Sequence, residues 1–298
     1  MFKSGYIAII GKPNVGKSTL LNGIIGEKIA ITTHKPQTTR NRITGIKTLD
    51  EGQLIFLDTP GIHRPETLLN RHLVETAQKA FGEADVVLLL VDANDAPGRD
   101  DLFILETFRE VPVPVILVIN KIDLVEKESL LPLIDAYRTR YAFKDVVPLS
   151  AQKGFNLGRL IPLILNLLPE GPKYFPDDLF TDLTERFLAA EMIREKVTLL
   201  THREVPYCAS VVVDLFKEDE ARNVIHIQAT IHVEKESQKG ILIGKGGTML
   251  KEIGKRARLD MEAFFNARIY LELFVRVSRN WTRDSRKLSE FGYAGEGR

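Results

Sequence analysis

The sequence is poor in cysteine and has no long apolar segment, and both absences limit what the protein can be. Its one cysteine, Cys208, allows neither a disulfide bond within the chain nor a cysteine-based metal site, so we expect a small buried residue. The longest strongly apolar run, Val86–Val91, has the length of a buried strand and is far too short to span a membrane. Residues Met1–Gly5 lead directly into a strand-like stretch without the apolar core of a signal peptide. We therefore expect a protein of the reducing cytoplasm.

Charge is nearly balanced over the whole chain but unevenly distributed along it. The 298 residues are 44% hydrophobic and 27% charged, which is typical of a globular protein, and their number favours two domains. Residues 181–238 hold seven Lys and Arg against eleven Asp and Glu, a net charge of −4, whereas residues 239–287 hold twelve against five, a net charge of +7. The basic segment is compatible with binding to a phosphate backbone, although a solvated helix face explains the charge equally well.

Short β-branched runs alternate with helical patterns in the first half of the chain. We predict strands at Tyr6–Ile10, Ile43–Lys47 (an edge strand), Leu54–Leu57, Val86–Val91, Val115–Ile119 and Val146–Leu149. Helices are predicted at Ser18–Ile25, Leu68–Ala80, Asp101–Phe108, Leu130–Arg140 and Leu157–Leu168. This alternation implies an α/β domain with a mostly parallel six-stranded sheet and helices on both faces.

A stretch that cannot continue a helix, Pro169–Pro176, marks a domain boundary. We predict a first domain at residues 1–172, a linker at 173–181 and a second, α+β domain at 182–298. The second domain is expected to run helix, strand, strand, glycine loop, helix, strand, at Asp182–Leu200, Cys208–Phe216, Val224–Val233, Gly244–Gly247, 248 to about 267, and Ile269–Val277. A final helix is predicted at Trp281–Tyr293; it either joins a nucleic-acid surface or caps the domain.

The first predicted strand is followed by the pattern G-x-x-x-x-G-K-[ST], here Gly11-Lys12-Pro13-Asn14-Val15-Gly16-Lys17-Ser18. In such a loop, backbone N–H groups and the N-terminus of the following helix face phosphate oxygens. Lys17 is expected to neutralise the β- and γ-phosphates, and Ser18 to ligate Mg²⁺. The sequence therefore predicts a nucleotide site at the end of this strand.

Two further segments fit the same site. Asp58-Thr59-Pro60-Gly61 ends an apolar strand, where Asp58 would reach the Mg²⁺ through a water and Gly61 could donate to the γ-phosphate. Gln37-Thr38-Thr39-Arg40 lies between the first helix and the edge strand and matches the switch I motif of GTPases. We expect Thr39, with Thr38 as the competitor, to close over the Mg²⁺ and the γ-phosphate.

Base specificity is predicted by Asn120-Lys121-Ile122-Asp123, which resembles the guanine-recognition motif of the GTPase superfamily. Asp123 can accept hydrogen bonds from guanine N1–H and the 2-amino group, and adenine offers no such donor pair. Asn120 would brace the loops and the stem of Lys121 would lie over the base. Ser150-Ala151 resembles the fifth motif of these proteins, whose backbone helps to hold guanine O6.

Catalysis is expected to depend on positioning and charge neutralisation. Many small GTPases place a glutamine directly after the glycine of the third motif, but this chain has Ile62, which cannot orient a water. Asn14 matches the asparagine of relatives that use K⁺ near the phosphates, so we expect slow turnover raised by K⁺. His34 and His63 are interpreted as loop histidines rather than catalytic bases.

The loop Ile243-Gly244-Lys245-Gly246-Gly247 opens a helix and resembles the Gly-x-x-Gly loop of a type II KH domain. That loop clamps the backbone of single-stranded RNA while an adjacent groove takes the bases. The element order of this half fits the type II arrangement. The candidate RNA-binding residues are Lys239, Ile243, Gly244, Lys245, Gly246, Gly247, Lys251, Lys255, Arg256 and Arg258.

Together, the two sets of motifs resemble the Era family of bacterial GTPases over nearly the whole chain. The resemblance implies GTP and GDP binding with Mg²⁺ and K⁺, and GTP hydrolysis. It also implies binding to the 3′ end of 16S ribosomal RNA, a role in 30S subunit assembly, a monomer, and loose association with the inner face of the plasma membrane. The nucleotide-site candidates are Gly11, Lys12, Pro13, Asn14, Val15, Gly16, Lys17, Ser18, Thr19, Asp58, Thr59, Pro60, Gly61, Ile62, Asn120, Lys121, Asp123, Ser150, Ala151 and Gln152; of these, Ser18 and Asp58, with Thr39, would hold Mg²⁺, and Asn14 would face K⁺.

Three alternatives stay open at this stage. A metabolic P-loop phosphotransferase would share the first motif but not Asn120–Asp123. An RNA-binding protein whose G domain has negligible turnover is compatible with Ile62. A GTPase that binds RNA other than ribosomal RNA would carry all the same motifs.

Overall fold

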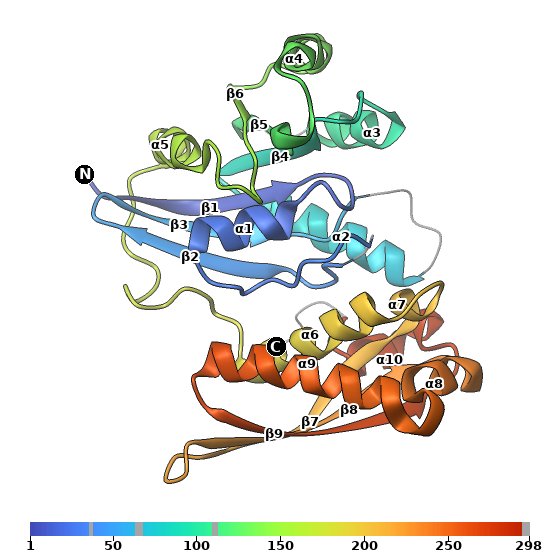
Figure 1. The fold of residues 1–298 in the computed structure, drawn as a ribbon. Coiled ribbons are helices and arrows are strands. Elements are labelled where there is room, and N and C mark those ends of the chain that lie inside the picture. Colours follow the sequence, from blue (N-terminus) through green and yellow to red (C-terminus); the bar gives the residue numbers. More distant parts are fainter. Residues whose placement is uncertain (36–37, 63–67, 109–112, 294–298) are drawn as a thin grey trace. The chain divides into compact units, whose positions relative to one another are not determined.

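The computed structural model describes residues 1–35, 38–62, 68–108 and 113–293 (Figure 1). These residues form two compact units. The first contains 1–30, 39–62 and 73–182, and the second contains 31–35, 38, 68–72 and 183–293. Two residues of the sequence motifs, Gln37 and His63, lie outside the described residues.

A six-stranded sheet organises the first unit, in the order β2-β3-β1-β4-β5-β6. Its strands are β1 (Lys3–Ile10), β2 (Ile43–Leu49), β3 (Gly52–Asp58), β4 (Val86–Asp92), β5 (Val115–Asn120) and β6 (Asp145–Pro148). Only the edge strand β2 is antiparallel, and it pairs with β3. The predicted strand positions and the mostly parallel sheet are therefore confirmed.

Helices cover both faces of this sheet. They are α1 (Lys17–Ile25), α2 (Leu68–Gly82), α3 (Arg99–Phe108), α4 (Leu130–Arg138) and α5 (Leu157–Leu167), with short 3₁₀ turns η1 (Ile122–Leu124) and η2 (Lys127–Ser129). Residues of α2, α3 and α4 share one buried cluster with β1, β4 and β5, and α1 lies on the opposite face from α2 (Figure 1). Burial on both faces explains why β4 and β5 are continuous apolar runs rather than alternating ones.

The stretch predicted as a linker is hydrogen-bonded to β2 and β3 inside the first unit. The side chain of Gln53 accepts from the N–H groups of Tyr174 and Phe175 at 2.8 and 3.0 Å. Thr181 donates to the carbonyl of Thr44 at 2.7 Å, and Ile46 N–H donates to the carbonyl of Phe180. The domain boundaries at residues 172 and 182 stay a proposal. The predicted linker between them runs along the edge of the sheet.

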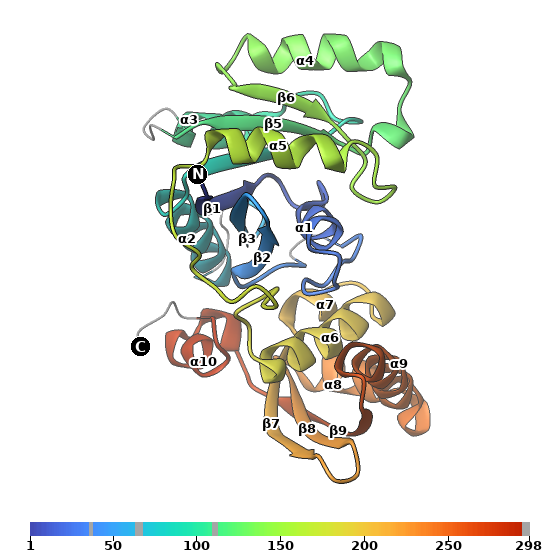
Figure 2. The ribbon, with the colours of Figure 1, turned by 90° about the vertical axis from the view of Figure 1, so that its left-hand side faces the viewer.

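The second unit has a three-stranded sheet, β7-β8-β9, with helices beside it (Figure 2). In chain order its elements are α6 (Glu185–Leu200), α7 (Val205–Cys208), β7 (Ser210–Asp219), β8 (Val224–Val233), α8 (Glu236–Ile243), η3 (Lys245–Gly247), α9 (Thr248–Phe265) and β9 (Arg268–Val277). β7 and β8 are antiparallel, whereas β8 and β9 are parallel. The helix α8 was not predicted, because it is only eight residues long and contains Gly240. The side chain of Gln238 forms its N-terminal cap by accepting from the N–H of Lys235 at 3.0 Å.

The single helix predicted at Trp281–Tyr293 is wrong. Asp284 separates a 3₁₀ turn, η4 (Trp281–Arg283), from α10 (Ser285–Glu290), because its side chain accepts from the N–H groups of Arg286 and Lys287 and so begins a new helix. Trp281 is fully buried, donates from Nε1 to the carbonyl of Cys208 at 2.8 Å, and stacks on Tyr293. This segment therefore caps the second unit, and Cys208 is buried as expected.

Among the described residues, no helix is long and apolar enough to cross a membrane.

Candidate functional site

The predicted phosphate-binding loop curls between β1 and α1. Gly16 has φ +100°, and a Cβ there would lie 2.3 Å from Nδ2 of Asn120, so only glycine fits. Asn14 also has positive φ, at 65°. The loop thereby turns into the N-terminus of α1, where free N–H groups favour anions.

Lys17 is the buried cation of this loop. Its Nζ donates to the carbonyl oxygens of Gly11 and Lys12 at 3.1 and 2.9 Å. Burial lowers the pKa of Lys17 to about 8, and the nearby carboxylate of Asp58 only partly opposes that effect. Burial makes the charged form of Lys17 unfavourable, and a phosphate bound in the loop would stabilise that charge.

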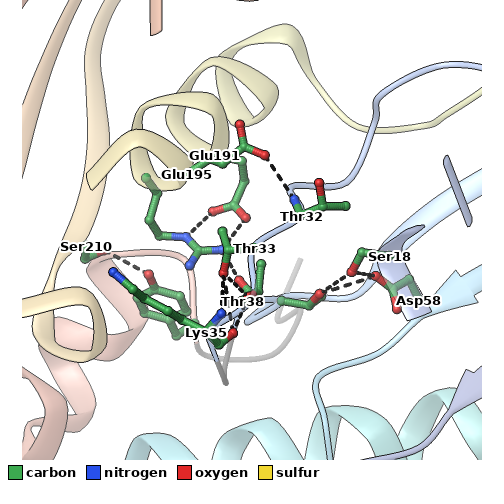
Figure 3. Close-up of polar contacts among 12 residues, drawn as sticks. Ser18, Thr32, Thr33, Lys35, Thr38, Asp58, Glu191, Glu195 and Ser210 are labelled. Carbon is green, nitrogen blue, oxygen red and sulfur yellow. Dashed lines mark hydrogen bonds and ion pairs between the residues drawn. The ribbon is translucent and has the colours of Figure 1, made fainter. Parts of the chain in front are cut away.

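Three oxygen-bearing side chains meet beside Lys17. Ser18 Oγ donates to Asp58 Oδ2 at 2.6 Å, and Thr39 Oγ1 lies 2.7 Å from Ser18 Oγ and 3.3 Å from Asp58 Oδ2; Figure 3 shows Ser18 and Asp58 pointing at one another. Asp58 is fully buried, and its other oxygen, Oδ1, has no hydrogen-bond partner among the residues that the structure describes. Burial raises the pKa of Asp58 to about 6, against the opposing effect of Lys17. Hydroxyl and carboxylate oxygens are ligands that Mg²⁺ prefers, so the cluster fits that ion.

The base-recognition motif follows β5. Asn120 donates from Nδ2 to the carbonyl of Val15 at 2.8 Å and accepts from the N–H of Ala151 at 2.9 Å. Lys121 has φ 65°, and its Nζ lies 2.5 Å from Asp92 Oδ2. Asp123 is exposed on η1. Asn120 thus joins the phosphate-binding loop to the loop that contains Ala151. Asp123 remains accessible to a bound base.

Ile62 is 4% exposed and packs in the core that holds α2, α3 and α4. Its N–H donates to the carbonyl of Gly11 at 3.2 Å, and a Cβ on Gly61 would lie 2.6 Å from the backbone nitrogen of Pro13. Ile62 therefore packs in the core and its backbone binds the phosphate-binding loop, so its side chain is not available to orient a water. Of the other nucleotide-site candidates, the structure buries Val15, Thr59, Pro60 and Ser150, half-buries Pro13 and Thr19, and exposes Gln152.

Two acidic partners were missed by the sequence analysis. Asp101, 1% exposed, lies 2.9 Å from Nζ of Lys12, and Asp92 pairs with Lys121. Asp92 ends a buried strand, as Asp58 does, and this shared position could have identified Asp92 as a site residue from the sequence. Asp101 lies on α3, and no sequence spacing relates α3 to the loop.

In the second unit, a groove of about 500 Å³ lies beside the glycine loop. Gly244 has φ +71°, and a Cβ there would lie 2.8 Å from Cβ of Met249, so the loop bends where a side chain is not tolerated. The groove is lined by Gly247 of η3 and by apolar and cationic residues of α9 and β9: Leu250, Lys251, Gly254, Lys255, Arg258, Ile269, Tyr270, Leu271 and Leu273. Such a surface suits the bases and phosphates of a single strand.

The predicted basic residues do not all line this groove. Lys251, Lys255 and Arg258 do, whereas Lys245 is exposed in the loop and Lys239 is half-buried on α8. Arg256 lies outside the lining and pairs with Glu252 at 2.6 Å. Tyr270, 54% exposed on β9, was missed because alternation alone does not tell which face of a strand carries a ligand.

Comparison with known proteins matches both halves of the chain. Residues 6–121 match the family described as 50S ribosome-binding GTPase, and residues 204–282 match the KH domain family. The chain is 62% identical to GTPase Era of Syntrophus aciditrophicus, covering 98% of this chain and 96% of that protein. It is 53% identical to GTPase Era of Geobacter metallireducens, covering 98% of each.

Two solved structures are similar over almost the full length. One is a crystal structure of Era in complex with MgGDPNP and nucleotides 1506–1542 of 16S ribosomal RNA, at TM-score 0.96 and 45% identity, covering 99% of this chain and 100% of that one. The other is an Aquifex aeolicus Era variant bound to GDP·AlF4⁻, with the same TM-score, identity and coverage.

Proposed function

Because the chain belongs to the Era family of GTPases, we propose that it is a GTP-dependent switch that binds the 3′ end of 16S ribosomal RNA and assists assembly of the small, 30S ribosomal subunit. Binding would take place in the cytoplasm, with the protein as a monomer and loosely associated with the inner face of the plasma membrane. GTP would favour the RNA-binding state, and hydrolysis would release the RNA.

The GTPase chemistry follows from the residues of the first unit. Lys17 would neutralise the β- and γ-phosphates, and Asp123 would accept from guanine N1–H and the 2-amino group. Ser18, Thr39 and Asp58 would hold Mg²⁺, which supplies charge neutralisation at the phosphates when bound. The side chain of Ile62 is buried and apolar, so it cannot orient the attacking water, and we propose K⁺ beside Asn14 as an additional positive charge near the phosphates.

The observation that supports RNA binding is the cationic groove beside Gly244–Gly247. Lys251, Lys255 and Arg258 line it together with apolar residues of α9 and β9. A solved relative with 45% identity carries the 3′ end of 16S ribosomal RNA. Phosphate contacts and base stacking both need this combination of cations and apolar surface.

The test is GTP hydrolysis in K⁺ buffer with and without a short RNA that matches the 3′ end of 16S ribosomal RNA. Wild type is compared with Gly244→Asp, which clashes with Met249 and adds a negative charge to the loop. Gly158→Asp is the matched control, since Gly158 has open space around it on α5. We expect RNA to stimulate wild type and the control, and Gly244→Asp to hydrolyse GTP only at the RNA-free rate. RNA that neither binds nor stimulates wild type would leave a GTPase without the ribosomal role.

A second candidate function is RNA binding with negligible turnover, which the buried Ile62 favours. This function predicts that each protein molecule hydrolyses about one GTP over hours, even with RNA and K⁺ present. Multiple turnovers in K⁺, and fewer in Na⁺, would exclude it. An RNA of unrelated sequence that stimulates equally well would instead favour a non-ribosomal RNA partner.

A further inference from the structure

Lys12, the second residue of the phosphate-binding loop, has its ammonium group bound by two acidic side chains. Its Nζ lies 2.9 Å from Asp101 Oδ2, on α3, and 3.5 Å from Asp95 Oδ2. Burial lowers the pKa of Lys12, but the two carboxylates outweigh that effect, so its pKa is raised and the side chain stays charged. The side chain of Lys12 is therefore tied to α3, and all of these residues belong to the first unit.

The backbone of Lys12 binds the other lysine of the loop. Its carbonyl oxygen accepts from Lys17 Nζ at 2.9 Å. The carbonyl oxygen of Gly11 accepts from the same Nζ at 3.1 Å and also from the N–H of Ile62. Because the side chain and the carbonyl group of Lys12 belong to one residue, whatever fixes that side chain also limits where the ammonium group of Lys17 can lie.

Asp101 is itself held in place. It is 1% exposed, and its Oδ2 also accepts from the N–H of Gly98, directly before α3, at 2.8 Å. Tyr137, fully buried on α4, is close enough to interact with it: burial raises the pKa of Tyr137, and the negative charge of Asp101 raises it further. Tyr137 thus stays a neutral phenol beside the carboxylate. A buried carboxylate is tolerated only where partners satisfy it, so Asp101 has little freedom to leave Lys12.

We propose that Asp101 is a positioning residue of the nucleotide site: through Lys12, it places the ammonium group of Lys17 at the phosphates. The contacts run from the carboxylate of Asp101 to the side chain of Lys12, and from the carbonyl group of Lys12 to Lys17 Nζ. The role concerns the phosphates and not guanine, which the residues after β5 would recognise. The proposal rests on the assignment of Lys17 to the phosphates and is independent of RNA binding.

The test compares two ligands of the nucleotide-free, full-length protein: GDP, and guanosine, which has the same base but no phosphates. Competition against a fluorescent GDP analogue at a fixed Mg²⁺ concentration measures both affinities. The variants are Asp101→Asn, which keeps the shape and removes the charge, Lys12→Met, and the two together. Glu106→Gln, at an exposed acidic residue of α3, is the matched control.

Thermal unfolding is recorded for each variant, because Lys12→Met leaves the carboxylate of Asp101 buried without its closest cation. If Lys12→Met does not fold, the double variant replaces it, since that variant buries neither charge. Lys12→Arg keeps a cation that can reach Asp101 and serves as the conservative variant.

We expect the affinity for GDP to fall about threefold to tenfold in Asp101→Asn and in Lys12→Met, the range for one lost hydrogen bond. The affinity for guanosine should stay within twofold of wild type, because guanosine has no group for Lys17 to bind. Lys12→Arg should keep most of the GDP affinity, and Glu106→Gln should match wild type. The loss in the double variant should be no larger than that in Lys12→Met, since Asp101 acts through Lys12.

Three results would overturn the proposal: unchanged GDP affinity in both single variants, losses that add in full in the double variant, or an equal loss of guanosine affinity. The second would mean that Asp101 acts apart from Lys12, and the third that the variants disturb the whole site. A wild type that binds GDP no more tightly than guanosine would overturn the assignment of Lys17 to the phosphates, and the proposal with it.

Discussion

The side-chain amide of Asn120 donates a hydrogen bond of 2.8 Å to the carbonyl oxygen of Val15, in the phosphate-binding loop. Because Asn120 also accepts from Ala151 N–H, one side chain joins the phosphate-binding loop to the loop that follows β6. Asn120→Ala leaves a buried carbonyl and a buried N–H unpaired, which costs about 1–3 kcal/mol. We expect the affinities for GTP and GDP to fall together, by about tenfold to a hundredfold. Titration with fluorescent analogues measures both, and Asn166→Ala, an exposed asparagine on α5, is the control. A loss limited to one nucleotide would contradict this role.

Base choice should depend on Asp123. Asp123→Asn replaces an acceptor by an amide that donates, so it no longer satisfies both guanine N1–H and the 2-amino group. We expect GTP affinity to fall more than about tenfold, since a hydrogen bond to a charged group contributes roughly 1.5–3 kcal/mol. Xanthosine triphosphate, which has a carbonyl in place of the amino group, should bind the variant better than it binds wild type. Competition binding with both nucleotides measures the change, with the exposed Asp178→Asn as control. An unchanged preference would show that the base is recognised elsewhere.

The first unit was predictable from the sequence because its strands are uninterrupted β-branched runs such as Val86–Val91, and its motifs sit at their ends. Two features of the second unit were not predicted. Helix α8 is eight residues long, and the patterned segment after Trp281 is divided by the cap at Asp284. Contacts between distant residues leave no local pattern at all: Thr32 and Glu195 are 163 positions apart. Only the folded chain shows that α6 buries its charges against the residues preceding Thr39.

Asp58 should make stability depend on pH. Burial raises its pKa from 3.8 to about 6, so between about pH 4 and pH 6 the folded state binds more protons than the unfolded state. The free energy of unfolding therefore falls as pH rises through this window. We expect nucleotide-free protein without Mg²⁺ to lose on the order of 1–3 kcal/mol from this group, and Asp58→Asn to abolish that part of the loss.

Urea titrations across this window measure the effect, with Asp178→Asn as a control that keeps the wild-type slope. Parallel curves for wild type and Asp58→Asn would mean that Asp58 does not titrate between these pH values. Mg²⁺ should reduce the slope of wild type alone, because the ion favours the carboxylate form.

Lys255 and Arg256 are neighbours on α9 and offer a matched pair for the RNA interface. Lys255 lines the groove, whereas Arg256 is paired with Glu252 and lies outside the lining. A cation that contacts phosphate releases counterions, so Lys255→Gln should weaken binding about threefold to tenfold and reduce the slope of log affinity against log salt by about 1. Arg256→Gln removes the same charge from the same helix and should leave that slope unchanged. Fluorescence anisotropy with the labelled 3′ RNA at several KCl concentrations measures both slopes. Equal reductions of the slope in the two variants would mean that the RNA responds to the overall charge of α9. A larger reduction in Arg256→Gln would mean that the RNA backbone lies along the outer face of that helix instead of the groove.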